Sequence, residues 1–335
     1  MTDFLKEIIS EIGDEYTQIA SDIDESETFV DTGSHILNAL VSGSIHGGVS
    51  GNKITAIAGE SSTGKTYFSL AVVQNFLNRH PNGICLYFDS ESAITRSLLE
   101  SRGVDVNRTV VINVVTIEDF RSKALQAVDK YLKIAEEKRL PMMYVLDSLG
   151  MLSTEKEISD ALADKQVRDM TKSQLVKGAF RMLTLKLGQA KVPLIVTNHT
   201  YDVIGSYVPT KEMGGGSGLK YAASTIIYLS KSKEKDGSAV IGNLIKAKTH
   251  KSRLSKENKE VTIRLYYDER GLDRYYGLLE LGEAGGLWKN VAGRYEIDGK
   301  KIYAKEIYKN PEKYFTEDVL EKLDVIAKST FLYGQ

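Results

Sequence analysis

Short apolar runs recur along the middle of the chain, and longer segments with helical spacing of apolar residues separate them. Short runs rich in β-branched and aromatic residues predict buried strands, whereas a 3.6-residue period predicts helices. The expected strands are 53–58, 84–89, 109–113, 142–147 and 193–198, and the expected helices are 65–79, 94–102, 117–138 and 169–190. This alternation indicates an α/β fold, in which a mostly parallel twisted sheet is flanked by helices.

Three later apolar runs, at 225–230, 243–248 and 261–267, follow one another with no helical pattern recognised between them. Strands joined in this way pair antiparallel, so we expect them to extend the sheet in that sense. The core is therefore expected to occupy residues 31–270.

The pattern changes at both ends of this core. Residues 1–30 begin as an amphipathic helix and continue as an acidic, weakly periodic stretch, which predicts an arm or linker used in oligomerisation. After residue 270 we expect a short helix at 278–287, a hairpin at 294–303 closed by Asp298-Gly299, and a helix at 316–328. Residues 271–335 are thus predicted to form a small C-terminal α+β domain.

The composition, with 42% hydrophobic and 27% charged residues among 335, is that of a soluble globular protein. The longest apolar runs are shorter than a membrane span and the first helix lacks signal-peptide character, so we expect a cytoplasmic protein without membrane contacts. A net charge of −1 means that any nucleic-acid contact must come from local basic patches. The single cysteine, Cys85, lies in an apolar run and is expected to be a buried structural thiol.

A phosphate-binding loop is the most specific motif of the chain, because it lies between an expected strand and an expected helix. Gly59 and Gly64 permit the backbone geometry that turns successive N–H groups toward phosphate oxygens. Lys65 is expected to reach the β- and γ-phosphates, and the Thr66 hydroxyl to bind Mg²⁺. The predicted ligands are ATP and Mg²⁺, and the expected nucleotide-binding residues are Gly59, Glu60, Ser61, Ser62, Thr63, Gly64, Lys65, Thr66 and Tyr67.

Polar side chains follow three other expected strands, at the edge where parallel sheets bind ligands. Asp147 is the candidate that organises Mg²⁺, through water, although a terminal Asp can be a simple cap. Glu91 is placed to activate the attacking water, with an exposed loop acid as the alternative. His199 is placed to sense the γ-phosphate, although alone it would be read as a surface histidine.

Taken in order, the motifs of this chain resemble those of RecA-type strand-exchange recombinases, most closely the UvsX-type recombinases of phages. The resemblance extends from about residue 28 onward and is weakest in the N-terminal arm and the C-terminal domain. The segments that carry it are Thr32-Gly33-Ser34, 59–66, 88–91, 146–148, Asp169-Met170-Thr171, 198–201, 213–221 and Lys251-Ser252-Arg253.

This resemblance implies catalytic roles for residues that the spacing alone does not assign. It makes Glu91 the water-activating acid and His199 the residue that couples the γ-phosphate to a DNA-binding loop. It also implies that Lys251 and Arg253 reach the ATP of a neighbouring protomer, whereas a solvated strand end is the plainer interpretation. Leu98 occupies the position at which relatives stack a Tyr on adenine, so base selectivity is expected to be looser.

Two segments, 149–168 and 200–217, have no obvious secondary-structure pattern, and the resemblance makes them the DNA-binding loops. The helix after the first segment carries basic residues without acids from 171 to 191, and the second segment mixes aromatic and basic residues with glycines. Met170 and Tyr207 are candidate wedges between bases, and the glycine run is either an ATP-dependent switch or a plain flexible loop. The expected DNA-binding residues are Met170, Lys172, Lys177, Arg181, Tyr201, Tyr207, Lys211, Gly214, Gly215 and Gly216.

The function implied is that of a DNA-dependent ATPase that forms a filament on single-stranded DNA and catalyses homologous pairing and strand exchange. Expected partners are single-stranded and double-stranded DNA, further copies of the chain, a recombination mediator and a single-strand-binding protein. If phage-encoded, it would act in the cytoplasm of a bacterial host, in recombination, repair and recombination-dependent replication. A ring helicase built on the same core and a nucleotide-gated regulatory ATPase remain alternatives.

Overall fold

The computed structural model describes residues 2–13, 17, 19, 21, 28–165, 170–202, 211–214, 217–297 and 299–334, with the side chains of residues 2 and 3 excepted. Candidate residues Tyr207, Gly215 and Gly216 lie outside this set, as does Asp169 of the motif Asp169-Met170-Thr171.

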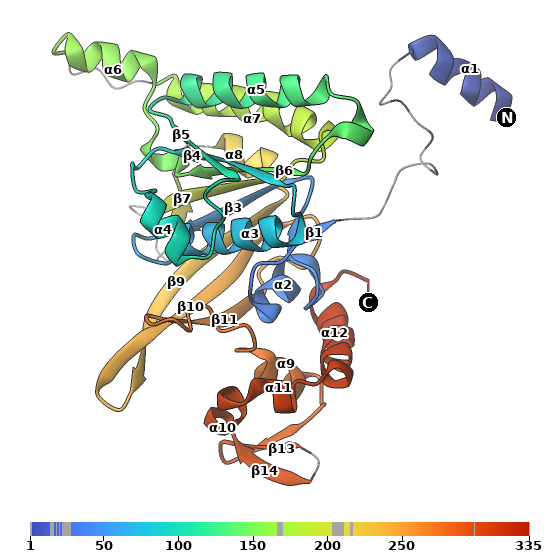
Figure 1. The fold of residues 1–335 in the computed structure, drawn as a ribbon, viewed down its shortest axis with the longest axis vertical. Coiled ribbons are helices and arrows are strands. Elements are labelled where there is room, and N and C mark those ends of the chain that lie inside the picture. Colours follow the sequence, from blue (N-terminus) through green and yellow to red (C-terminus); the bar gives the residue numbers. More distant parts are fainter. Residues whose placement is uncertain are drawn as a thin grey trace.

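A large sheet forms the centre of the molecule, with strand order β11-β10-β9-β3-β7-β6-β4-β5 (Figure 1). The strands from β9 to β5 pair parallel, which confirms the α/β fold with a mostly parallel sheet. The bounds are β3 (Ile54–Gly59), β4 (Ile84–Asp89), β5 (Thr109–Asn113), β6 (Met142–Asp147), β7 (Leu194–Asp202), β9 (Thr225–Asp236), β10 (Ala239–Ser252) and β11 (Glu260–Tyr266).

The expected direction of the later strands was correct for β10 and β11, which pair antiparallel, and wrong for β9. Strand β9 runs parallel to β3, with Thr225 beside Thr55. The reason is the short helix α8 (Ser217–Ala222), which packs on α7 (Lys172–Gln189) and lies between β8 (Lys211–Met213) and β9 along the chain. This helix carries the chain back to the edge of the sheet at which the parallel strands begin, so β9 runs in the same direction as β3.

Helices cover both faces of the sheet (Figure 1). On one face, α5 (Ile117–Leu132), α7 (Lys172–Gln189) and α8 pack over a hydrophobic cluster that includes Ala58, Phe88 and Leu146. On the other face, α2 (His35–Ser42), α3 (Lys65–Arg79) and α4 (Arg96–Ser101) pack over a second cluster. Cys85 belongs to this second cluster and is completely buried, as expected, and burial raises the pKa of its thiol.

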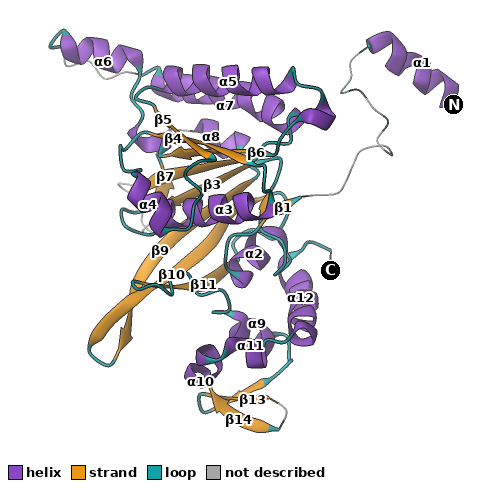
Figure 2. Cartoon of the chain, in the orientation of Figure 1, coloured by secondary structure: helices purple, strands orange, loops and turns teal. Residues whose placement is uncertain are grey.

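Beyond β11 the chain forms a smaller unit of short helices and a three-stranded antiparallel sheet (Figure 2). The expected short helix, the hairpin and the last helix are all present. Apolar side chains of the first and last helices share the hydrophobic cluster of α2 and α3, so this unit packs onto the core. Its elements are α9 (Leu278–Ala284), β12 (Lys289–Val291), β13 (Arg294–Ile297), β14 (Lys300–Tyr303), α10 (Ala304–Lys309), α11 (Pro311–Tyr314) and α12 (Glu317–Phe331).

Several elements were not expected from the sequence. The segment expected to be irregular at 149–168 contains α6 (Glu155–Leu162), which begins with a capping box between Thr154 and Glu157. The expected helix 117–138 ends at Leu132, and a 3₁₀ turn, η2 (Glu136–Lys138), follows it. The other additions are β1 (Phe29–Val30), α2, β2 (Val49–Ser50), the 3₁₀ turn η3 (Leu149–Met151), β8 (Lys211–Met213), α8, β12, α10 and α11.

The first helix, α1 (Thr2–Ile12), is amphipathic as expected, and its apolar side chains Phe4, Leu5, Ile8 and Ile12 are exposed. Among the helices of the described residues, none combines the length and the apolar character that crossing a bilayer requires.

Candidate functional site

The phosphate loop joins the carboxyl end of β3 to the amino end of α3. Gly64 is the N-cap of α3 and has a φ of +91°, in the left-handed region that favours glycine. A Cβ atom at Gly59 would lie 2.6 Å from the Thr63 hydroxyl oxygen and 2.8 Å from the Leu229 carbonyl oxygen. Both glycines are therefore required by the backbone, and the loop presents the amino end of a 15-residue helix to an anion.

Lys65, the second residue after Thr63, folds back across this loop. Its ammonium donates hydrogen bonds to the carbonyl oxygens of Gly59, at 3.0 Å, and Glu60, at 2.9 Å. Burial lowers the pKa of Lys65, and the charges of Glu91 and Asp147 oppose that shift. The side chain is thus a positive charge held within the turn that a nucleoside triphosphate would occupy.

The strand register brings the other candidates to the same edge of the sheet. Strand β7 lies between β3 and β6, and His199 pairs with Gly59. Strand β4 lies on the other side of β6, and Asp89 pairs with Asp147. Because parallel strands end together, residues far apart in the sequence converge beside the phosphate loop.

Asp147 is buried, with 4% of its surface exposed, and its carboxylate accepts hydrogen bonds from three hydroxyl groups. The donors are Thr66 at 2.7 Å, Tyr87 at 2.8 Å and Thr197. Thr66 and Asp147 are therefore in direct contact, so a Mg²⁺ ion bound to the Thr66 hydroxyl would have the Asp147 carboxylate within reach through water. Within the described residues, His, Cys, Asp and Glu form no group of three or more that could hold a metal ion by themselves.

Glu91 and His199 face each other next to Lys65. Glu91 Oε1 accepts a hydrogen bond from the Ser148 hydroxyl at 2.7 Å and lies 3.4 Å from His199 Nε2. The other ring nitrogen, His199 Nδ1, lies 3.5 Å from Lys65 Nζ. Backbone N–H groups of Glu91 and Ile94 donate to the Asp89 carboxylate, which holds the turn that carries Glu91. A carboxylate, an imidazole and an ammonium therefore meet where a γ-phosphate and its attacking water would lie.

The second segment predicted to be irregular, 200–217, contains regular secondary structure at both ends. Strand β7 continues to Asp202, and β8 pairs antiparallel with its end, so the expectation of an irregular loop from 200 to 217 was wrong at both of its ends. The Asn198 amide donates to the Gly214 carbonyl at 2.8 Å, and the Gly214 N–H donates to the His199 carbonyl at 3.0 Å. The base of this hairpin is thus bonded to the residues beside the phosphate loop.

The expected DNA-binding residues divide into exposed and paired side chains. Met170 and Tyr201 are exposed by 78% and 58%, and Lys177 and Arg181 are exposed on α7. Lys172 is paired, because its ammonium lies 3.6 Å from the Glu157 carboxylate of α6. Lys186 likewise pairs with Asp129 of α5. Neighbouring helices therefore supply the acids that the sequence of α7 lacks.

Lys251 and Arg253 do not join the cluster at the phosphate loop of their own chain. Lys251 pairs with Ile226, which is level with Ala56 toward the amino edge of the sheet. Its ammonium donates to the carbonyl oxygens of Lys220, at 2.7 Å, and Tyr221, at 3.1 Å. Burial, followed by the charge of Arg253, lowers the pKa of Lys251. A role in catalysis would have to involve the site of another protomer.

Two of the expected nucleotide-binding residues have other neighbours in this chain. Leu98 is partly buried and packs on the hydrophobic cluster of α3. The ring of Tyr67 lies under the Arg102 guanidinium, 4.5 Å away, and its hydroxyl accepts a hydrogen bond from the Leu272 N–H at 3.1 Å. Contact of Leu98 with adenine and of Tyr67 with the nucleotide remain predictions.

Sequence reasoning missed the hydroxyl groups that hold the acids. Tyr87 lies in a strand and looks like an ordinary core residue, so its pattern carries no signal for the bond to Asp147. Ser148 follows Asp147 directly and Thr197 lies two residues before His199, and this closeness to candidate residues was a usable signal.

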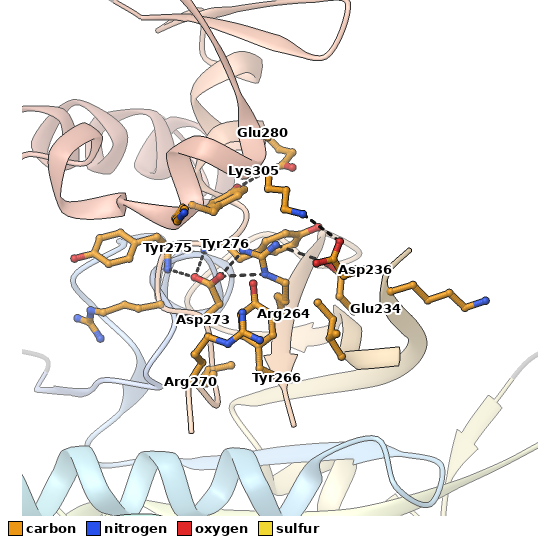
Figure 3. Close-up of a pocket in the computed structure, with 17 residues that line it drawn as sticks. Glu234, Asp236, Arg264, Tyr266, Arg270, Asp273, Tyr275, Tyr276, Glu280 and Lys305 are labelled. Carbon is orange, nitrogen blue, oxygen red and sulfur yellow. Dashed lines mark hydrogen bonds and ion pairs between the residues drawn. The ribbon is translucent and has the colours of Figure 1, made fainter. Parts of the chain in front are cut away.

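A cavity of about 870 Å³ lies away from the phosphate loop, between the β9–β10 hairpin, β11 and the C-terminal unit (Figure 3). At its wall the Arg264 guanidinium lies 4.4 to 5.0 Å from the ring centroids of Tyr266, Tyr276 and Tyr308. It also forms an ion pair with Asp273 at 2.6 Å. This arginine connects the sheet to the C-terminal unit, and its contacts indicate a structural role.

The chain is similar to several known proteins. Residues 2–273 match the family model described as the RecA N-terminal domain. The recombination and repair protein of Enterobacteria phage T4 is 35% identical over 261 residues, which are 78% of this chain and 65% of that protein. Two RecA proteins are more distant. That of Clavibacter michiganensis is 26% identical, covering 79% of this chain and 72% of the relative, and that of Cereibacter sphaeroides is 27% identical, covering 76% and 71%.

The resemblance to RecA-type proteins expected from the motifs is thereby confirmed, as is the likeness to a phage recombination protein. The match covers more than half of the chain and includes every strand of the central sheet. The phosphate loop, Asp147, Glu91 and His199 lie at one edge of that sheet. On the family match, the chain belongs to the RecA family.

Proposed function

We propose that this protein is an ATP-dependent recombinase that forms a filament on single-stranded DNA and catalyses homologous pairing and strand exchange. The observation that carries this proposal is the cluster of Lys65, Glu91 and His199 at the base of the β7–β8 hairpin. A nucleotide at the phosphate loop would contact residues that continue directly into a predicted DNA-binding segment. Kinship with a phage recombination and repair protein and with RecA favours this function over a ring helicase or a regulatory ATPase.

The nucleotide chemistry follows from the side chains at the sheet edge. Lys65 and the N–H groups at the start of α3 would bind the phosphates of ATP. Thr66, and Asp147 through water, would hold Mg²⁺, which would neutralise phosphate charge. Glu91 accepts a proton from the attacking water, and Ser148 and His199 orient its carboxylate. The His199 ring lies between Glu91 and Lys65, next to the place where the γ-phosphate would bind. Loss of the γ-phosphate would remove negative charge beside this ring, and His199 would in this way sense hydrolysis.

DNA binding uses the exposed side chains that adjoin this edge. Arg181 and Lys177 on α7 neutralise backbone phosphates, and Tyr201 and Met170 contact bases. Stacking and phosphate contacts carry little sequence information, so base pairing performs the homology search. Further copies of the chain, a loading mediator and a single-strand-binding protein are the partners that we propose, in the cytoplasm of a bacterial host.

The test is formation of joint molecules. The protein is incubated with ATP, Mg²⁺ and a labelled single strand, and supercoiled duplex of homologous or unrelated sequence is then added. Joint molecules with the homologous duplex alone are expected, and none with the Lys65→Ala variant. Equal yields with both duplexes, or ATP-dependent DNA binding by Lys65→Ala, would contradict the proposal.

The contribution of Lys251 and Arg253 to a neighbour's site is a separate proposal. Each Ala variant is expected to lose ATPase activity while its circular dichroism spectrum stays that of a folded protein. Mixing Lys251→Ala with Lys65→Ala should restore part of the activity, because a mixed pair then contains one intact composite site. Full activity of both single Ala variants would remove the shared-site model.

A further inference from the structure

Among the described residues, side chains of the β7–β8 hairpin reach the site at the phosphate loop at two points. The first is the contact of His199 with Lys65 and Glu91 described above. The second is an ion pair between Lys211, at the start of β8, and the Glu60 carboxylate in the phosphate loop. Lys211 pairs with Asp202 across the hairpin, so the ion pair lies at the point where the predicted DNA-binding segment leaves the sheet.

The phosphate loop has a third contact that does not involve this hairpin. The Lys231 ammonium, from β9, donates to the Ser62 carbonyl oxygen at 2.8 Å. Lys231 therefore holds the loop from the neighbouring strand, whereas Lys211 joins it to the hairpin. Lys231 can therefore only support the phosphate loop, whereas Lys211 can couple the phosphate loop to the predicted DNA-binding segment.

We propose that Lys211 and Glu60 are positioning residues whose ion pair couples nucleotide binding at the phosphate loop to DNA binding by the 200–217 segment. The inference rests on the proposed ATP-dependent binding of single-stranded DNA. Neither side chain needs to touch the reacting atoms. A nucleotide-dependent shift of Glu60 moves β8 through Lys211, alongside the contact at His199.

The geometry sets the size of the effect. The side chains of Lys211 and Glu60 are 44% and 56% exposed, so the ion pair is solvated and contributes modestly. A coupling of this kind corresponds to a change of about two- to fivefold in an equilibrium constant. Because coupling between two sites is reciprocal, DNA should alter nucleotide affinity by the same factor.

The experiment measures the affinity of the full-length protein for a labelled single strand by fluorescence anisotropy, at one salt concentration. Affinity is measured without nucleotide and with a saturating non-hydrolysable ATP analogue and Mg²⁺. The readout is the dissociation constant without nucleotide divided by the dissociation constant with the analogue. Lys211→Gln and Glu60→Gln are each expected to lower this ratio about two- to fivefold. The double variant should match either single variant, and Lys211→Arg should keep the wild-type ratio.

Two control variants separate coupling from other effects. Glu212→Gln removes an acid on the same strand that pairs with Lys220 at 3.5 Å, and it should leave the ratio unchanged. Lys231→Gln disturbs the phosphate loop without touching the hairpin, so it should change nucleotide affinity and leave the ratio unchanged.

The outcomes distinguish this inference from the proposed function. A wild-type ratio of one would overturn both. With a wild-type ratio above one, two results would overturn the inference alone. One is that Lys211→Gln weakens DNA binding equally in both states, as a simple DNA contact would. The other is that Glu60→Gln leaves the ratio unchanged.

Discussion

The hydroxyl of Tyr87 offers a direct test of how Asp147, the acid proposed to organise Mg²⁺, is held. Tyr87 is completely buried, and its hydroxyl donates to Asp147 Oδ2 at 2.8 Å. Burial, followed by the charge of Asp147, raises the pKa of Tyr87, so the hydroxyl remains a donor at neutral pH. The substitution Tyr87→Phe keeps the ring and removes only this donor. Ser69, which lies 3.3 Å from the same hydroxyl, keeps its own bond to the Thr66 carbonyl.

The magnitude follows from the charge of the acceptor. A hydrogen bond to a charged group contributes about 1.5–3 kcal/mol to stability, so Tyr87→Phe should lower the free energy of unfolding by about 2 kcal/mol. Tyr144→Phe is a matched control, because Tyr144 is also completely buried, on the adjacent strand β6. Its hydroxyl reaches only the neutral Ala124 carbonyl, at 3.4 Å, and this bond should contribute less than about 1 kcal/mol.

Urea unfolding with linear extrapolation measures both variants. The added stabilisation by ATP and Mg²⁺ is a second readout, since it should fall for Tyr87→Phe and stay unchanged for Tyr144→Phe. Equal destabilisation by the two substitutions, or a larger loss for Tyr144→Phe, would refute the reasoning that the charge of Asp147 makes the Tyr87 bond strong.

Three further predictions concern other groups. Arg264→Ala should lower the free energy of unfolding by about 3–5 kcal/mol, because it leaves the nearly buried Asp273 carboxylate without its ion-pair partner. Arg270→Ala, which removes an exposed ion pair, should lower it far less in the same urea assay, and similar losses for the two variants would contradict this reasoning. Burial, with a smaller effect from the charge of Arg274, lowers the pKa of His35 from 6.5 to about 4. As the pH falls, His35 is therefore protonated in the unfolded chain before it is protonated in the folded protein. The free energy of unfolding should then fall by about 3 kcal/mol as the pH drops from 6.5 to 4. That loss should be absent in His35→Gln, and a parallel decline in both proteins would rule out His35 as its source. Glu91→Gln should lower ATP hydrolysis about 10²- to 10⁴-fold in a phosphate-release assay while a fluorescent ATP analogue still binds, and unaltered hydrolysis would exclude Glu91 as the base.

Four of the parallel strands, β3, β4, β5 and β6, were predicted to within one residue, whereas β7 and β9 extend beyond their expected ends. Strands buried on both faces read as continuous apolar runs, which makes them easy to predict. All six residues of β3 are buried, and so are all six of β6. The acids that follow such runs were identifiable for the same reason, since a polar residue that ends an apolar strand lies at the ligand-binding edge. Asp147 and Glu91 were found in this way.

Other features depended on contacts between distant segments. The direction of β9 follows from α8, a helix of six residues whose pattern is too short to read in the sequence. The acids that pair with Lys172 and Lys186 come from α6 and α5, so the basic character of α7 was overstated when it was judged alone. Lys211 was expected to contact DNA, and its ion pair with Glu60 joins residues 151 positions apart.

The sequence by itself determined the phosphate loop, the order of strands along the chain and the residue types at the strand ends, because these features depend on local backbone geometry and on periodic burial. Only the tertiary structure decided which side chains meet. The order β3-β7-β6-β4 brings His199, Asp147 and Glu91 beside Lys65, and it places Tyr87 and Thr197 where their hydroxyls hold Asp147. Such contacts arise from strand pairing between residues far apart in the chain, and a one-dimensional pattern does not record that pairing.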